Sequence, residues 1–383
     1  MPSLRARIES LVTLAGSYVL RRPATTIAGA RAGLPPVLAL SAIPSALLWG
    51  AALATTGGAQ ALRIGVRVRR VPVLRPSRAI FVDAHELAPV CTLISDTHLV
   101  APGRTPCELE EDRAQWPYPT LPTRHSIIGA LRRVLRHVAK HAPSTVLWCG
   151  DEVDTGDDAE WDAWAEVVDS VPGLSHRLLP GNHDICFNRP FEHDFALTRR
   201  ALRERAFGDR AGALNTFPLF DTIASARGQV TTVLLDSCRH PSTHVLSNAV
   251  GWFGAAQLAE LERTLQRVRG PLLVATHHHV WRDARFLQPE TWYETAIDAD
   301  LLVAILARYR ARGPRNHVLV CHGHRHIAGA GTVGDPAIQI VALPSTTLGD
   351  KPDGLLDAVL RYSIAGIRAD GTWGVAVREV GVH

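Results

Sequence analysis

Five short polar segments hold the residues of this chain whose types and spacing suit metal chemistry. The segments are Asp96-Thr97-His98, Gly150-Asp151-Glu152-Val153-Asp154, Gly181-Asn182-His183-Asp184, His277-His278-His279 and Gly323-His324-Arg325-His326. Each follows an apolar run and places Asp, Asn or His where that run ends. Imidazole nitrogens and carboxylate or amide oxygens are the donors that borderline divalent metals accept. The pattern therefore predicts one polynuclear metal site gathered from distant parts of the chain.

The apolar runs before these segments have the length of buried strands and alternate with helical patterns. The runs are Val90–Ser95, Thr145–Cys149, Arg177–Leu179, Val230–Leu235, Leu272–Thr276, Val318–Cys321 and Ile338–Leu343. Apolar residues at helical spacing predict helices around 127–138 and 258–268, with less regular helices around 157–170, 193–207 and 298–311. Strands separated by helices indicate a layered α/β domain. In such sheets ligands bind beyond the carboxyl ends of the strands, where the five polar segments lie.

Taken together, the five segments carry a recognisable set of motifs. D-x-H, G-D-x-x-D, G-N-H-D, a later histidine run and G-H-x-H resemble the calcineurin-like metallophosphoesterase superfamily over about residues 90–345. The resemblance implies an αββα sandwich and a phosphoric ester hydrolase with two divalent ions, such as Mn, Fe or Zn. It also implies attack on the phosphate ester by a metal-activated water or hydroxide.

The resemblance assigns a role to each matching position. One metal ion would be held by Asp96, His98 and His326, with Asp151 bridging to the second ion. The second ion would be completed by Asn182, His277 and His324. His183 would lie beside the phosphate and assist the leaving group, and Asp154 and Asp184 would orient imidazole rings.

The histidine run leaves two alternatives for one ligand. The family usually shows His-His-Pro here, whereas this chain has three histidines followed by Val280. Alignment of the preceding strand favours His277 as the ligand, with His278 as the alternative.

Departures from subfamily patterns narrow the function. Purple acid phosphatases place a metal-binding tyrosine where this chain has Asp154. Ser/Thr phosphoprotein phosphatases carry an arginine where this chain has Thr155, and tend to carry glutamate at the position of Asp184. The motifs look more like bacterial phosphodiesterases acting on small molecules, nucleotides or lipids. A nuclease of the same superfamily and a membrane-associated binding protein with a vestigial site are the alternatives.

The first 63 residues differ from the rest and are expected to form an apolar, helical N-terminal extension before a metallophosphoesterase domain over 64–383. No charged residue occurs between positions 32 and 62, and residues 37–56 are long enough to cross a bilayer as a helix. A cleaved signal and a soluble apolar hairpin are the other interpretations, because prolines interrupt the stretch. Localisation is therefore either membrane-associated or cytoplasmic. A strand-like segment, residues 64–73, leads into the domain, and a proline-rich loop is expected over 103–123.

Composition excludes several classes of protein. The 383 residues include 46% hydrophobic and 20% charged residues, which is typical of a globular chain rather than a disordered one. The net charge of +4 is too small and too dispersed for nucleic acid to be the expected partner. The six cysteines form no C-x-x-C pair and indicate reduced thiols. A small-molecule or lipid phosphate ester is the expected substrate.

Overall fold

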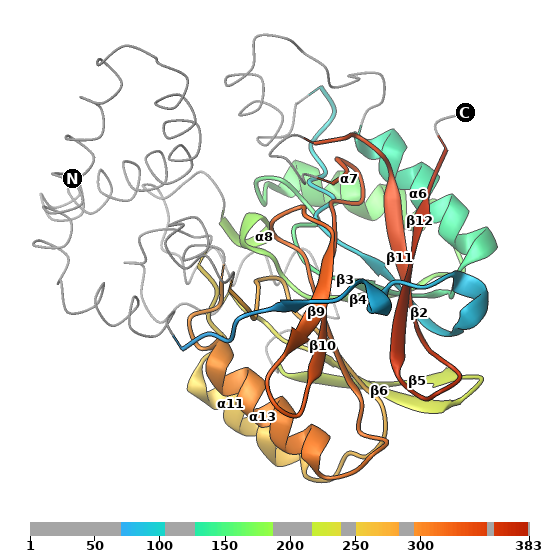
Figure 1. Ribbon diagram of the computed structural model, residues 1–383. Coiled ribbons are helices and arrows are strands. Elements are labelled where there is room, and N and C mark those ends of the chain that lie inside the picture. The colour runs from blue at the N-terminus through green and yellow to red at the C-terminus, as the bar shows by residue number, and fades with distance from the viewer. Residues whose placement is uncertain are drawn as a thin grey trace, which may run out of the picture.

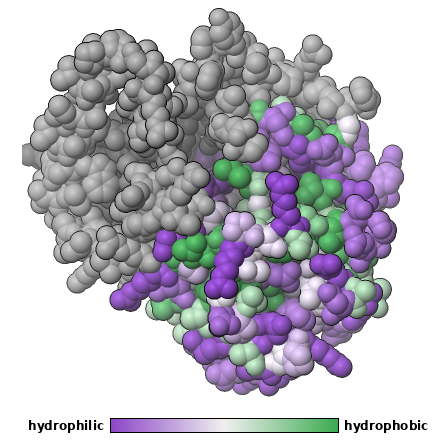
Figure 2. Space-filling model, viewed as in Figure 1, coloured by the Kyte–Doolittle hydropathy of each residue, from purple (hydrophilic) through white to green (hydrophobic). Residues whose placement is uncertain are grey.

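The structure is a computed structural model that describes residues 70–103, 127–186, 217–238, 250–282, 295–350 and 356–381. The apolar stretch 37–56, the boundary expected at 63/64 and the helix expected around 193–207 lie outside these residues, as does nearly all of the proline-rich loop. Among the residues described, no helix is both long enough and apolar enough to cross a bilayer. On the visible face of the described part, hydrophilic and hydrophobic residues are interspersed (Figure 2).

Two β-sheets form the centre of the molecule (Figure 1). The first contains, in spatial order, β1 (Arg75–Pro76), β9 (Gly329–Val333), β10 (Ile338–Ala342), β8 (Val318–His322), β7 (Leu272–Ala275), β6 (Gly228–Leu234) and β5 (Leu219–Ser225). The second contains β12 (Trp373–Glu379), β11 (Arg361–Ile367), β2 (Ala88–Ile94), β3 (Thr145–Trp148) and β4 (Ser175–Leu178).

Helices cover the outer face of each sheet (Figure 1). The longer ones are α6 (Ile127–His141), α7 (Asp158–Asp169), α11 (Ala255–Leu265) and α13 (Ala299–Ala311), with a short α8 (Asn182–Cys186) and the 3-10 turns η1 (Arg78–Ile80) and η2 (Ala84–Glu86). Helix α6 forms because its apolar residues recur on one face, and Leu131, Val134, Leu135 and Val138 are all fully buried.

Three separate apolar cores show that the layers are stacked as helix, sheet, sheet, helix. One core joins α6 and α7 to the second sheet and includes the buried Trp148 and Trp164. A second core lies between the two sheets, with Trp373 fully buried in it. The third joins α11 and α13 to the first sheet. The predicted αββα architecture is therefore confirmed. The free, buried Cys91, Cys149 and Cys321 belong to the core between the sheets.

Parallel pairing explains why the polar segments meet. Strands β2, β3 and β4 are parallel neighbours, as are β6, β7 and β8 in the other sheet. Their carboxyl ends therefore reach one edge of each sheet, and all five polar segments start within a few residues of a strand end there. The segment at Gly323 follows β8 directly.

The structure also corrects the sequence interpretation. The strand expected over 64–73 is not formed at 70–73, where Val73 makes only a single bridge to Arg282. Pro72 lacks the amide proton that a ladder needs at this point. Strands β5, β9, β11 and β12 were not expected; they are antiparallel and only partly apolar, so their sequences lack a continuous apolar run.

Candidate metal centre

The backbone is unusual at most of the predicted metal ligands. Five of them adopt positive φ, namely Asp96 (51°), His98 (41°), Asp151 (55°), His324 (80°) and His326 (56°). Ala358 is the one other non-glycine residue with positive φ in the described part of the chain. Such conformations cost about 1–3 kcal/mol each and persist where the surrounding structure enforces them. Conformational strain is therefore concentrated at this one location.

The first half of the site gathers Asp96, His98 and His326, all buried. The Nε2 atoms of His98 and His326 lie 3.0 Å apart, and His326 Nε2 lies 3.5 Å from Asp96 Oδ1. His98 Nδ1 lies 3.0 Å from Asp154 Oδ1. Because a carboxylate only accepts, Nδ1–H of His98 is the donor, and its Nε2 lone pair is directed into the site.

The second half gathers Asn182, His277 and His324. His277 Nε2 lies 2.9 Å from Asn182 Oδ1 and 3.0 Å from His324 Nδ1. His277 Nδ1 donates to the backbone carbonyl of Cys149 at 2.9 Å, so its Nε2 also faces inward. Asn182 comes from the start of α8, His277 follows β7 and His324 follows β8.

Asp151 lies between the two halves. Its Oδ2 is 3.2 Å from His277 Nε2 and 3.8 Å from His98 Nε2, while its Oδ1 accepts the amide proton of His183 at 2.9 Å. The donor groups Asp96–His98–His326 and Asp96–Asp151–His277 each have ligand atoms within 4.8 Å of one another. All seven predicted ligands therefore converge around one carboxylate.

These donors fit divalent cations. Two histidine pairs, His98–His326 and His277–His324, each place two ring nitrogens 3.0 Å apart. Such an arrangement needs a shared proton or a cation between the lone pairs. Neighbouring ligands on one ion, each at about 2.1 Å, are separated by about 3.0 Å in octahedral geometry. The mixed imidazole, carboxylate and amide set suits Mn, Fe or Zn.

The electrostatics of the site also favour positive charge near Asp151. Burial disfavours the charged form of His277, but the negative charge of Asp151 outweighs burial and raises the pKa of His277 to about 9. Burial alone would raise the pKa of Asp151, yet the neighbouring His277 and His183 lower it well below its ordinary value. Burial, followed by the charge of His277, lowers the pKa of His324 well below its ordinary value. Asp151 is therefore ionised and His324 neutral, as metal ligands must be.

His183 lies at the edge of this site, with 4% of its surface exposed. Its Nδ1 donates to the backbone carbonyl of Asp154 at 2.7 Å. The other ring nitrogen, Nε2, is thus the one that can exchange a proton. The His183 ring stands edge-on to that of His98, with centroids 4.5 Å apart.

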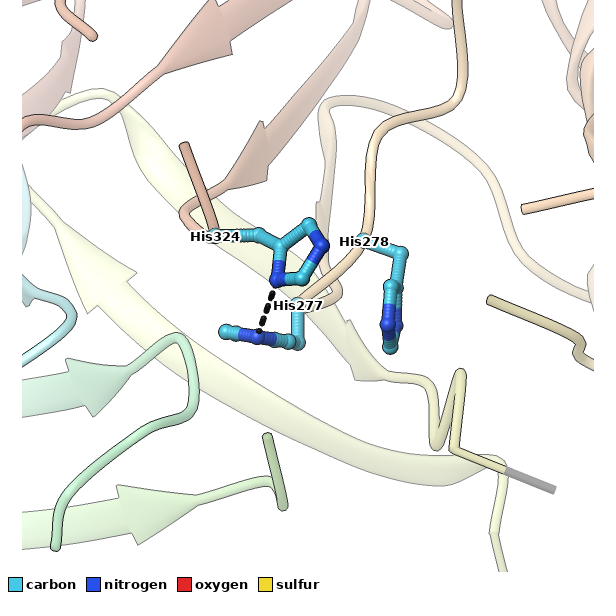
Figure 3. Close-up of side chains that lie close together, drawn as sticks. All are labelled: His277, His278 and His324. Atoms are coloured by element: carbon cyan, nitrogen blue, oxygen red, sulfur yellow. Dashed lines mark hydrogen bonds between the residues drawn. The ribbon is translucent and has the colours of Figure 1, made fainter. Parts of the chain in front are cut away.

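The two alternatives in the histidine run differ in their surroundings (Figure 3). His277 contacts Asp151, Asn182 and His324, and the dashed line in Figure 3 joins it to His324. The His278 ring packs beside this pair, with its centroid 4.5 Å from that of His324 and with donor atoms of all three rings within 4.8 Å of one another, but its Nδ1 is hydrogen-bonded to Ser237 Oγ at 2.8 Å. His277 is thus the one of the two with a contact to Asp151, whereas His278 Nδ1 is occupied by Ser237.

Glu152 is a buried residue of the site that the sequence interpretation left without a role. Burial and the negative charge of Asp184 raise the pKa of its carboxyl well above the ordinary value, which favours the protonated form. Asp184 in turn accepts the amide protons of Asp151, Val153 and Gly181. Asp184 therefore fixes the loop that carries Asp151. The sequence feature that could have indicated a role for Glu152 is the additional acidic residue between Asp151 and Asp154 in G-D-E-V-D.

One family model agrees with this geometry. The family model described as calcineurin-like phosphoesterase matches residues 90–328. No curated protein matches the sequence. The fold is similar to that of a dimetal phosphatase from Danio rerio, at 16% identity and a TM-score of 0.47, covering 78% of this chain and 100% of that one.

Two further solved structures are similar to the chain. The purple acid phosphatase PPD1 from yellow lupin has 10% identity and a TM-score of 0.44, with 76% of this chain and 54% of that one covered. The phosphopantetheinyl hydrolase from Mycobacterium tuberculosis has 14% identity and a TM-score of 0.39, with 68% and 91% covered.

The family match spans more than half of the chain and includes all seven predicted ligands. The resemblance seen in the five motifs is thereby confirmed. This chain belongs to the calcineurin-like phosphoesterase family and is a phosphoesterase.

Proposed function

We propose that the chain hydrolyses a small-molecule phosphate ester at a dinuclear metal centre. Asp96, His98 and His326 would hold one cation, while Asn182, His277 and His324 would hold the other. Asp151 is shared by both.

One observation carries this proposal. Two histidine pairs, each with ring nitrogens 3.0 Å apart, lie on either side of a single ionised carboxylate oxygen, Asp151 Oδ2. A mononuclear site needs only one such pair. Two metal positions flanking a shared carboxylate suit the clamping of a phosphoryl group during in-line displacement.

When bound, the cations supply Lewis acidity toward a phosphoryl oxygen and lower the pKa of coordinated water. Residues of the chain orient the ligands and supply the proton for the leaving group. Asp154 fixes the tautomer and orientation of His98, and the carbonyl of Cys149 does the same for His277. His183 donates the proton on Nε2 to the leaving oxygen as its bond to phosphorus breaks. Asp154 O holds that ring in place.

The substrate class follows from the motifs and from the charge of the chain. Asp154 and Thr155 replace the tyrosine and arginine of the purple acid and phosphoprotein phosphatases, and the net charge is only +4. We therefore expect a small phosphomonoester or phosphodiester, including nucleotide or lipid headgroup esters, in preference to a phosphoprotein or nucleic acid.

The test combines metal analysis with turnover. The full-length protein is loaded with Mn²⁺, Zn²⁺ or Fe²⁺, its metal content is measured, and it is assayed against aryl phosphomonoesters, aryl phosphodiesters and DNA. We expect two metal equivalents and hydrolysis of a small ester. In Asp151→Asn, metal content and activity should fall together, because the affinity for metal should drop by more than about 100-fold.

Asp169→Asn is the matched control, because Asp169 lies exposed at the end of α7. It should retain both metal equivalents and full activity. A wild-type protein that binds no metal, or binds two equivalents and turns over no ester, would contradict the proposal. Faster cleavage of DNA than of any small ester would identify a nuclease instead.

A further inference from the structure

We propose that the loop Ser345–Thr347 is a hydroxyl clamp that positions the metal ligands Asp96 and His98. The clamp lies beyond β10, some 250 residues from the ligands in sequence, and outside the family-matched residues 90–328. The inference rests on the proposed metal centre and adds to it a set of residues that contact no metal.

Three successive side chains of the clamp bind the backbone before and between the two ligands. Ser345 Oγ donates to the carbonyl of Asp96 at 2.5 Å, and Thr347 Oγ1 donates to the carbonyl of Thr97 at 2.6 Å. Thr346 Oγ1 accepts the amide proton of Ser95 at 3.2 Å, and Thr346 N donates to the carbonyl of Ser95 at 2.9 Å.

These contacts act on the torsions that aim the ligands. A carbonyl oxygen belongs to the peptide plane shared by its own residue and the next one, so holding it restrains ψ of the first residue and φ of the second. Ser345 therefore restrains ψ of Asp96, and Thr347 restrains φ of His98. Both ligands adopt left-handed backbone conformations, with φ of 51° and 41°. An unrestrained chain would leave such conformations at a gain of about 1–3 kcal/mol per residue.

Burial makes the hydrogen bonds of these hydroxyls energetically important. Ser345 is 0% exposed, Thr347 is 5% exposed, and Thr97 between the ligands is 0% exposed. At positions as buried as these, a carbonyl that loses its donor gains no replacement donor from solvent. Removing one clamp hydroxyl should thus shift the ligand loop rather than leave it in place.

The clamp is held in place by β11, and the residues it binds are hydrogen-bonded in turn to the loop that carries Asp151. The amide of Arg361, at the start of β11, donates to Thr346 O at 3.1 Å, while the Arg361 side chain is ion-paired with Asp357 and Glu379. On the other side, Thr97 Oγ1 donates to the carbonyl of Glu152 at 2.6 Å. This bond ties the loop that carries Asp96 and His98 to the loop that carries Asp151. Residues that touch neither metal thus link β11 to both ligand loops.

A purely structural loop and a positioning clamp predict different results. A loop that only packs would lower the stability of the whole protein when altered, and would weaken both metal positions alike. A positioning clamp should weaken the position formed by Asp96, His98 and His326, and spare the position formed by Asn182, His277 and His324.

The experiment measures the two stepwise Zn²⁺ affinities of the full-length protein by competition with a chelator. Thr347→Val keeps the shape of the side chain and removes the hydroxyl, whereas Thr347→Ser keeps the hydroxyl. We expect Thr347→Val to lower one affinity about 10- to 100-fold, the usual effect of losing a partner behind a metal ligand, and Thr347→Ser to keep the wild-type values. In a His326→Ala background, which already lacks the first position, Thr347→Val should change the remaining affinity little.

Each outcome bears on the inference. Wild-type affinities in Thr347→Val, or an equal loss at both positions with a lower melting temperature of the metal-free protein, would overturn the clamp while leaving the proposed function intact. A wild-type protein without metal affinity would overturn the proposed function itself. If Thr347→Val does not fold, Thr347→Ala compared with Thr347→Ser gives the same contrast, and equal affinities in these two would count against the clamp.

Discussion

His183 illustrates how a single side chain is prepared for its task. The carbonyl of Asp154 accepts a hydrogen bond from Nδ1–H, and the His98 ring packs edge-on against the imidazole. The backbone amide of His183 also binds Asp151 Oδ1, so its position is tied to the shared metal ligand. The residue can therefore lose its side chain without removing any proposed ligand.

That separation yields a prediction. His183→Ala should keep two metal equivalents but lower kcat by roughly 10²–10⁴-fold, the usual contribution of acid–base assistance. Metal analysis and steady-state kinetics on the same preparation would measure both quantities. His141→Ala, at the exposed end of α6, is the control. Unchanged kcat in His183→Ala would remove the proposed proton donor.

A second residue-scale prediction concerns His277 in the metal-free protein. Its pKa is raised from 6.5 to about 9, so its contribution to stability is fully present below pH 6.5 and is lost as the pH rises through 9. Urea unfolding in the presence of a chelator should show the free energy of unfolding falling over this interval. His277→Gln should flatten the profile. The same fall in His277→Gln as in the wild type would assign it to another group.

At the scale of elements, the turns after the strands bring the ligand loops into contact. Gly150, with φ of 89°, separates β3 from Asp151, and a Cβ added there would lie 2.5 Å from His277 Nδ1 and 2.8 Å from Gly181 N. At Gly323, an added Cβ would collide with Ser95 Oγ and Asp96 Oδ2. Glycine allows the loops after β2, β3 and β8 to approach closely enough for one site.

Gly173 provides a matched test of this close approach. Its φ of 90° equals that of Gly150 within a degree, yet nothing lies within 4 Å of an added Cβ. Gly173→Ala should lower the free energy of unfolding by about 1–2 kcal/mol, from left-handed strain alone, and leave metal binding unchanged. Gly150→Ala should lose more stability and also bind metal more weakly. Chemical denaturation and metal titration of both variants would check this, and equal effects would show that contact with His277 is unimportant.

At the scale of the whole molecule, the metal centre joins the two sheets. The second sheet and the helix that follows it supply Asp96, His98, Asp151 and Asn182, while the first sheet supplies His277, His324 and His326. Each proposed metal position takes ligands from both sheets. Cations should therefore act as cross-links across the inter-sheet core.

Metal removal should consequently lower the stability of the whole described domain. A cation at 100 times its Kd stabilises a folded protein by about 2.7 kcal/mol, which corresponds to a shift in Tm of roughly 5–10 °C for a domain of this size. Calorimetry before and after chelation would measure the shift, and added metal should reverse it. An unchanged Tm after proven removal would show that the sheets are held together without the metal.

The sequence by itself determined the chemistry and the class of fold. Donor types such as Asp96, Asn182 and His324 are visible as letters, and their positions after apolar runs place them at strand ends. Both properties are local, since each apolar run and the polar residue that ends it lie within about ten positions of one another. These local patterns predicted the layered α/β class and one shared metal site, and the resemblance of the five motifs to a known family supplied the αββα sandwich and the role of each ligand.

Only the tertiary structure decided how those residues face one another. It turned His277 toward Asp151 and His278 toward Ser237, a difference of one residue that depends on the path of the chain after β7. It also imposed the left-handed backbone at five ligands and brought Ser345 and Thr347 onto the Asp96 loop. Such contacts join residues up to about 250 positions apart, and their energy exists only once both sheets have packed.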